Sequence, residues 1–81
     1  MASVEKIHAG LSTILEVSRE LNVNCSACAE HDEIYAGVNV PNDFPKNEEE
    51  KSTKMMCDVT MEDLGWSKND DDGDLSYQIF T

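Results

Sequence analysis

Three cysteines and one histidine are the residues whose types and spacing first indicate chemistry. Cys25, Cys28 and His31 follow one another at a regular interval, and Cys57 lies farther along the chain. Thiolate and imidazole groups are the usual ligands of tetrahedral zinc sites, and a bound metal ion adds stability that a small core lacks. One interpretation of the sequence is therefore a small zinc-stabilised protein-interaction module that uses these four residues.

The same cysteines have a second interpretation, in which they are small apolar residues of the core. The segment around Cys25 and Cys28 alternates apolar and polar residues, as a strand does. Residues three apart in a strand point to opposite faces, so this pair binds one metal ion only if the chain forms a knuckle there. A redox role is not favoured, because a redox cysteine pair normally follows a strand and lies at a helix N-terminus.

The other residue patterns do not predict an enzyme. His31, Asp32 and Glu33 place an imidazole beside two carboxylates, a combination that is typical of a solvated turn. Aligning Gly73 with the glycine of a calcium-binding loop puts Lys68 where an acidic ligand is required. The chain also lacks a phosphate-binding glycine loop. We therefore expect a non-catalytic protein.

Carboxylates dominate the charge of the chain. Seventeen Asp and Glu residues oppose six Lys and Arg residues, which gives a formal net charge of -11. Two acidic clusters lie in the second half, namely Asp70, Asp71, Asp72 and Asp74, and Glu48, Glu49 and Glu50. Such a field repels nucleic acid and attracts a basic protein surface. These acids thus predict a basic protein or nucleoprotein partner, and no direct nucleic-acid binding; the alternative is that the charge serves solubility alone.

Helical periodicity is clearest at the start of the chain. Apolar residues recur at helical spacing from Val4 to Leu21, and Ser3 can cap the first amides, so we expect an amphipathic helix over residues 3–21. The apolar stripe runs at near-heptad spacing, and a chain this short has a thin core. Pairing of this helix with its copy in a homodimer is therefore a third possibility.

The middle of the chain favours two strands and a second helix. Alternating and β-branched residues predict strands near 23–29 and 33–38, joined by a turn. Asn47 has the features of a helix N-cap and Gly65 those of a helix stop, which favours a helix between them. Residues 53–61 also alternate like a strand, so their conformation stays open at this point.

The end of the chain predicts a hairpin. Trp66 begins one strand, residues 69–74 form the turn, and the following residues alternate up to Phe80. We expect both helices to pack upon Trp66, Tyr77, Ile79 and Phe80. The whole prediction is a single α+β domain over residues 1–81, with two helices and a small antiparallel sheet of about four strands.

Two segments resemble a group of small acidic proteins that phages and prophages encode. They are the run Glu30-His31-Asp32-Glu33-Ile34-Tyr35-Ala36-Gly37, and the stretch from Met61-Glu62-Asp63-Leu64-Gly65-Trp66 to Tyr77-Gln78-Ile79-Phe80-Thr81. In that group a strand with a His-Asp-Glu-Ile-like run precedes a helix that ends in Leu-Gly-Trp, and a hairpin closes the domain. The resemblance covers roughly half of the chain. It implies an inhibitor or adaptor that acts on a host protein, with anti-CRISPR proteins as one such class.

Composition and termini bear on the compartment. No apolar run is long enough to span a membrane, and the first residues lack the pattern of a signal peptide. Three cysteines are an odd number, which fits reduced thiols better than a disulfide framework. We therefore expect a cytoplasmic protein, in a bacterial host if it is phage-encoded, with no membrane partner and, outside the zinc interpretation, no cofactor.

Overall fold

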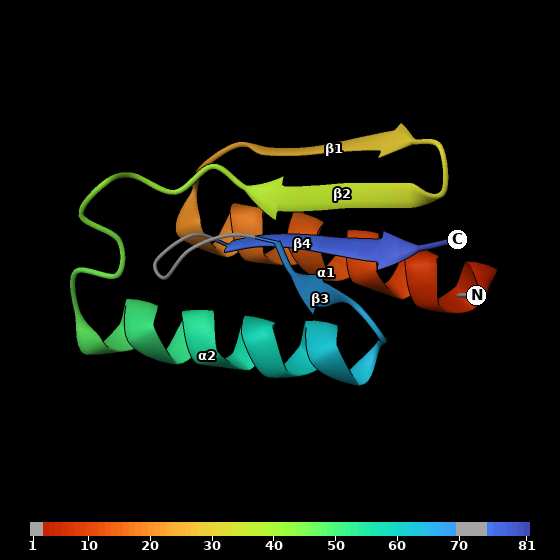
Figure 1. The fold of residues 1–81 in the computed structure, drawn as a ribbon. Helices are drawn as coiled ribbons and strands as arrows, with labels where there is room; N and C mark the ends of the chain where they lie inside the picture. The colour runs from red at the N-terminus through yellow and green to blue at the C-terminus, as the bar shows by residue number, and fades with distance from the viewer. Residues whose placement is uncertain (1–2, 70–74) are drawn as a thin grey trace.

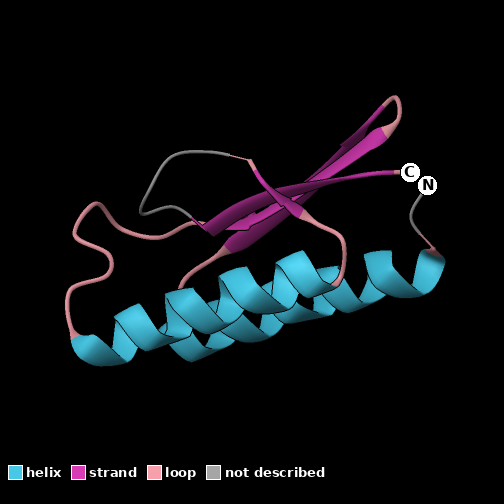
Figure 2. Cartoon of the chain, turned by 60° about the horizontal axis from the view of Figure 1, so that its bottom comes forward, coloured by secondary structure: helices cyan, strands magenta, loops and turns pink. Residues whose placement is uncertain are grey.

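The computed structural model describes residues 3–69 and 75–81, and these residues form two helices and one four-stranded antiparallel sheet (Figure 1). Both helices lie against the same face of the sheet, and neither helix covers the opposite face (Figure 2). The α+β class is thereby confirmed. The elements are α1 (Val4–Leu21), β1 (Cys25–Glu30), β2 (Glu33–Val38), α2 (Glu48–Asp63), β3 (Ser67–Lys68) and β4 (Leu75–Phe80).

The first helix has the boundaries that its capping residues predict. The Ser3 hydroxyl accepts a hydrogen bond from the Lys6 amide at 3.2 Å, and Asn22 ends the helix in the left-handed conformation with φ 58°. Ile14 and Val17 are buried against the sheet of the same chain. The apolar stripe is therefore largely covered by the same chain, and pairing of this helix with its copy stays a prediction.

Residues 53–61 are helical, which settles the ambiguity of that segment. The Asn47 side chain accepts from the Glu50 amide at 2.8 Å, and the Glu50 carboxylate accepts from the Lys46 amide at 2.9 Å. Gly65 follows the helix with φ 88°, a conformation that favours glycine. Capping at both ends therefore outweighs the alternating pattern. Of the alternating residues, Cys57 is buried and Met55 is exposed, so they do not share one face.

The strands lie in the order β1-β2-β4-β3, so β4 is inserted between β2 and β3. All three pairings are antiparallel, and the predicted C-terminal hairpin corresponds to β3 and β4. His31 has φ 47° in the tight turn between β1 and β2. No helix among the described residues combines the length and the apolar character that crossing a membrane requires.

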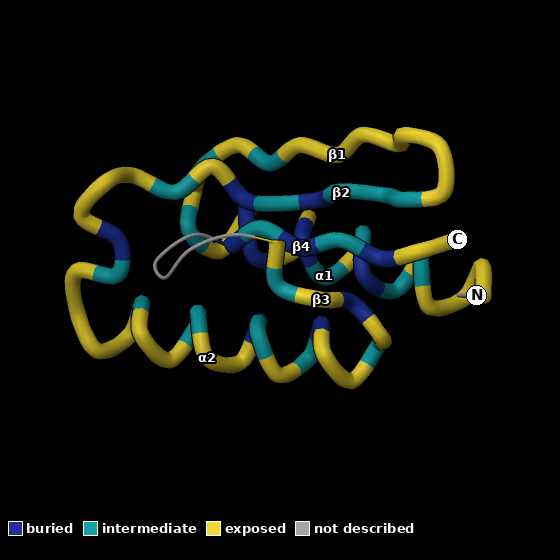
Figure 3. The backbone as a smooth tube through the Cα atoms, viewed as in Figure 1, coloured by how far each residue is buried: buried dark blue, intermediate teal, exposed yellow. Residues whose placement is uncertain are grey.

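The core lies between the sheet and the two helices (Figure 3). Its largest fully buried side chains are Trp66, Tyr77, Met61 and Leu75. The Trp66 indole lies directly against Gly10 of α1, where an added Cβ would be only 2.2 Å from Nε1. The same Nε1–H donates to the Lys6 carbonyl at 3.3 Å. Gly10 is therefore tolerated in the helix because it lets this indole approach the backbone.

Phe80 corrects one prediction about this core. Trp66, Tyr77 and Ile79 are buried as expected, but the Phe80 side chain is 58% exposed. Ile79 and Phe80 are adjacent in β4, and successive residues of a strand point to opposite faces. Since Ile79 points toward the helices, Phe80 must point to the uncovered face.

Candidate functional site

The predicted zinc ligands on β1 point in different directions. Cys25 pairs with Val38 and Cys28 pairs with Tyr35 across an uninterrupted ladder. The strand has no knuckle, so the two thiols lie on opposite faces of the sheet. Cys25 is half-buried on the helix side, whereas Cys28 is exposed.

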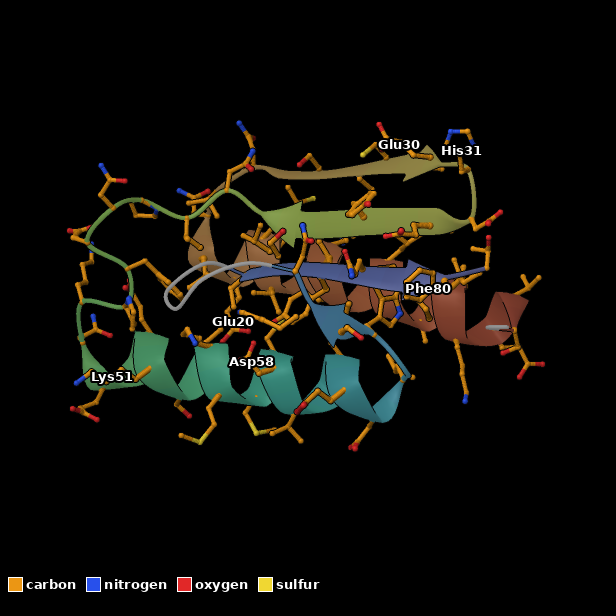
Figure 4. All side chains as sticks on the ribbon, viewed as in Figure 1. Glu20, Glu30, His31, Lys51, Asp58 and Phe80 are labelled. Atoms are coloured by element: carbon orange, nitrogen blue, oxygen red, sulfur yellow. The ribbon has the colours of Figure 1, made fainter. Side chains whose placement is uncertain are left out.

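The two remaining predicted ligands lie elsewhere. Figure 4 shows His31 in the turn at the tip of the β1–β2 hairpin, and Cys57 is buried on α2. Burial raises the pKa of the Cys57 thiol, which keeps it protonated and apolar. Within residues 3–69 and 75–81, no group of three or more His, Cys, Asp or Glu side chains is placed to hold a metal ion. The described residues therefore do not assemble the predicted zinc site. Cys57 fits the interpretation as a small core residue, and half-buried Cys25 packs against the same core, whereas Cys28 does not.

A chelator is expected to leave the unfolding temperature of the purified protein unchanged. The reason is that Cys25 and Cys28 lie on opposite faces of the sheet, so one ion cannot bind both. Thermal unfolding followed by circular dichroism with and without EDTA, together with metal analysis, checks this expectation. Cys28→Ser serves as a matched variant that should unfold like the wild type. Stoichiometric zinc and a chelator-induced loss of stability would contradict the arrangement.

The predicted acidic clusters have different outcomes. Asp70, Asp71, Asp72 and Asp74 lie outside the described residues. Glu48, Glu49 and Glu50 form the first turn of α2, where carboxylates interact favourably with the helix dipole. Glu48 pairs with Lys51 at 3.4 Å while remaining 91% exposed, and Glu50 caps the helix. This cluster therefore helps to start α2, and the carboxylates of Glu48 and Glu49 also face solvent.

A polar cluster links α2 to β3 and β4. The Asp58 carboxylate, labelled in Figure 4, accepts hydrogen bonds from the Tyr77 hydroxyl at 2.5 Å, Lys68 Nζ at 3.1 Å and Lys54 Nζ at 3.3 Å. Lys68 Nζ also lies 4.9 Å from the centre of the Tyr77 ring, a cation–π distance. Only the spacing of four between Lys54 and Asp58 is a local signal for this cluster, because Lys68 and Tyr77 come from two other elements.

Burial and hydrogen bonding act in opposite directions on Asp58. Burial alone would raise the pKa of this carboxyl, but the bonds from Tyr77, Lys68 and Lys54 hold its pKa below the ordinary value. Burial, reinforced by the hydrogen bond to Asp58, raises the pKa of Tyr77. At neutral pH the phenol is therefore the donor and the carboxylate the acceptor, an arrangement that holds α2 to the sheet.

The uncovered face of the sheet collects the polar and aromatic side chains of the strands. The residue pairing and the alternation of strand side chains define its members. We call this surface the open face; it consists of Ser26, Cys28, Glu30, Glu33, Tyr35, Gly37, Ser67, Ser76, Gln78 and Phe80.

Acidic and aromatic residues are neighbours on the open face. Glu33 lies opposite Glu30 on one side and opposite Phe80 on the other. Tyr35 follows Glu33 on the same face, and a side-chain hydrogen bond with Glu33 raises the pKa of the Tyr35 phenol. Gln78 lies beside Tyr35. Two rings and two carboxylates therefore lie at one end of the face.

A glycine creates a depression in the open face. Gly37 lies between Ser26 and Ser76, where it leaves a hollow of about 440 Å³ that Tyr35 and Cys28 border. An added Cβ at Gly37 would lie 2.8 Å from the Leu75 carbonyl oxygen, so the neighbouring backbone requires glycine here. The face thus offers a concavity beside its aromatic and acidic end.

Sequence reasoning missed the open face, although part of its signal is local. Tyr35 and Phe80 alternate with buried residues within their strands, and this alternation assigns each to the face opposite the core. Their proximity is not local, because it depends on β4 pairing with β2.

Comparisons of the chain with models of protein families, with curated proteins and with solved structures found no match. The evidence for a function therefore comes from the chemistry of the described side chains. The open face and the excess of carboxylates are the two features that bear on this function.

Proposed function

We propose that this protein is a non-catalytic inhibitor or adaptor that binds a basic surface of another protein. The observation that carries the proposal is the open face, where Tyr35, Phe80, Glu30 and Glu33 lie together on the side of the sheet that neither α1 nor α2 covers. The resemblance to small acidic phage proteins supports the same role, with a host protein as the partner.

The chemistry of this end of the open face matches lysine and arginine side chains. A cation can lie over the face of the Tyr35 ring, and the carboxylates of Glu30 and Glu33 can accept charge-assisted hydrogen bonds from it. Phe80 adds an exposed apolar anchor of the kind that dominates binding energy at interfaces. A basic partner therefore gains both ion pairs and apolar burial at one place.

The remaining acids act at longer range. A net charge of -11 speeds the encounter with a basic surface, and the predicted clusters at 48–50 and 70–74 contribute to it. An anti-CRISPR role is the specific form of this proposal, in which carboxylates occupy a positively charged site that normally holds nucleic-acid phosphates.

Replacing Tyr35 and Phe80 together with serine is expected to weaken binding to a basic surface at least about tenfold. The probe is a fluorescent arginine-rich peptide, and anisotropy measures its dissociation constant. Met55→Ser/Met56→Ser is the matched control, because it removes two exposed apolar side chains from α2 without changing charge or the open face. Circular dichroism verifies that both variants fold.

Salt and a direct inhibition assay complete the test. Binding should weaken steeply as ionic strength rises from about 0.05 to about 0.3 M, because exposed charges become screened. Purified CRISPR effector–guide complexes should bind less DNA when the protein is added. The Tyr35→Ser/Phe80→Ser variant should reduce this DNA binding less than the wild type does. Equal binding by the variant and the wild type would exclude the open face, and binding that is insensitive to salt would exclude recognition of a basic surface.

A further inference from the structure

The two edges of the sheet differ in length and exposure. β3 forms one edge and has two residues, whereas β1 forms the other edge with six residues. Every residue of β1 except Cys25 is exposed (Figure 3). β1 is therefore the edge that can accept another strand.

The hydrogen bonds at the start of β1 fix which of its backbone groups point outward. The Asn39 amide donates to the Asn24 carbonyl at 2.8 Å, so Asn24 directs its backbone groups toward β2. Hydrogen-bonded and non-bonded pairs alternate along an antiparallel ladder. The residues whose N–H and C=O groups point away from the sheet are consequently Cys25, Ala27 and Ala29.

β1 lacks the devices that proteins use to protect an edge strand. It has no lysine, no proline and no bulge, and its one charged residue, Glu30, lies at its end. Ala27 and Ala29 offer no side-chain bulk that would keep a second strand away. Nothing in the sequence of this strand opposes pairing.

We propose that β1 pairs with β1 of a second copy of this chain, antiparallel and centred on Ala27. In this two-fold register Ala27 exchanges both backbone hydrogen bonds with the partner's Ala27. Cys25 does the same with the partner's Ala29, and Ala29 with the partner's Cys25. Every outward backbone group of the strand is thus satisfied. If the register shifts by two residues in either direction, one of these three residues faces a position outside the partner's β1 and loses its pairing residue.

The side chains are compatible with the same register. Ser26 lies opposite the partner's Cys28, so small residues meet on the open face. Glu30 lies opposite the partner's Asn24, which keeps the two copies of Glu30 at opposite ends of the ladder. The symmetry axis is perpendicular to the sheet, so the helices of both copies lie on one side and the two open faces become continuous.

This pairing does not depend on the proposed function, and salt separates the two. Each copy carries a charge of -11, so repulsion opposes dimerisation and screening relieves it. Added salt should therefore tighten the dimer, whereas it should weaken binding to a basic partner. If the dimer is not found, binding to a basic partner can still be tested, and the reverse also holds.

Sedimentation equilibrium tests the dimer, since the chain has a mass of 9.0 kDa. The wild type should reach twice this mass at concentrations up to about 0.5 mM, and Ala27→Pro should raise the dimer dissociation constant at least about tenfold. Proline is tolerated in an edge strand where the N–H faces solvent, so the monomer should keep its fold. Ala27→Lys places like charges opposite each other and should have the same effect, whereas Ser67→Lys on the other edge should have none.

A cross-link tests the register. Ser26→Cys puts a thiol opposite the partner's Cys28 in a non-bonded pair, where Cα atoms are about 4.5 Å apart and a disulfide can form. Mild oxidation should give a covalent dimer, and Ser26→Cys/Cys28→Ser should not. A wild type that stays monomeric at high salt, or a dimer that is unaffected by Ala27→Pro and Ala27→Lys, would overturn the proposal.

Discussion

Trp66→Ala is expected to lower the free energy of unfolding by about 3–5 kcal/mol, which is as much as a single core of this size commonly supplies. The side chain is 2% exposed and fills the space beside Gly10. Its removal leaves a cavity and also breaks the hydrogen bond to the Lys6 carbonyl. Most of the variant should be unfolded at room temperature.

Urea unfolding followed by far-ultraviolet circular dichroism measures this loss. Trp66→Phe is the matched control, because it keeps an aromatic ring while removing the Nε1–H donor, and it should cost less. Gly10→Ala tests the same contact from the helix. The new Cβ would clash with the rigid indole, so we expect a loss of about 1–3 kcal/mol although alanine is the better helix former. A stabilised Gly10→Ala variant would refute the close contact.

Asp58→Ala is expected to cost about 2–3 kcal/mol, the second largest effect. The substitution leaves the buried Tyr77 hydroxyl without its acceptor and removes the carboxylate that Lys54 and Lys68 share. Tyr77→Phe removes the donor instead and should cost less, because Asp58 keeps both lysines. A double-mutant cycle between Asp58 and Tyr77 gives their coupling energy. Additive effects of the two substitutions would show that the hydrogen bond contributes nothing to stability.

The Asp58 cluster also predicts a pH dependence. Its pKa in the folded protein is lower than the ordinary value of 3.8, so the unfolded chain takes up the proton first as the pH falls. The stabilisation is therefore complete above about pH 5 and is lost as the pH falls through the folded-state pKa. Urea unfolding of the wild type and Asp58→Asn between pH 6 and pH 2, as an approximate range, isolates this contribution. Parallel curves for the two proteins would contradict it.

Local signals predicted most of the secondary structure. Ser3, Asn47 and Gly65 mark helix ends that the structure confirms, because capping depends on only a few neighbouring residues. The sequence also predicts that Phe80 belongs to the core with Trp66, Tyr77 and Ile79, whereas the residue is 58% exposed. Strand alternation overrides that prediction, since Ile79 already points inward.

The site was harder to predict because its parts are distant in sequence. Asp58 and Tyr77 meet only when α2 packs beneath β4, and Phe80 comes opposite Glu33 only when β4 pairs with β2. The zinc interpretation of Cys25 and Cys28 depended on a turn that the ladder with β2 does not contain. Long-range pairing therefore decides which residues share a surface, and a one-dimensional pattern does not record it.

The position of β4 constrains how the chain is made in the cell. β4 separates β2 from β3 in the sheet, yet it follows both of them in the sequence. When α1, β1, β2 and α2 have emerged from the ribosome, the growing chain still lacks β4. This strand supplies Leu75, Tyr77 and Ile79 to the core. Until then the apolar faces of both helices are exposed to water or bound by a chaperone. We therefore expect stable folding to begin only after residues 75–80 have left the ribosome.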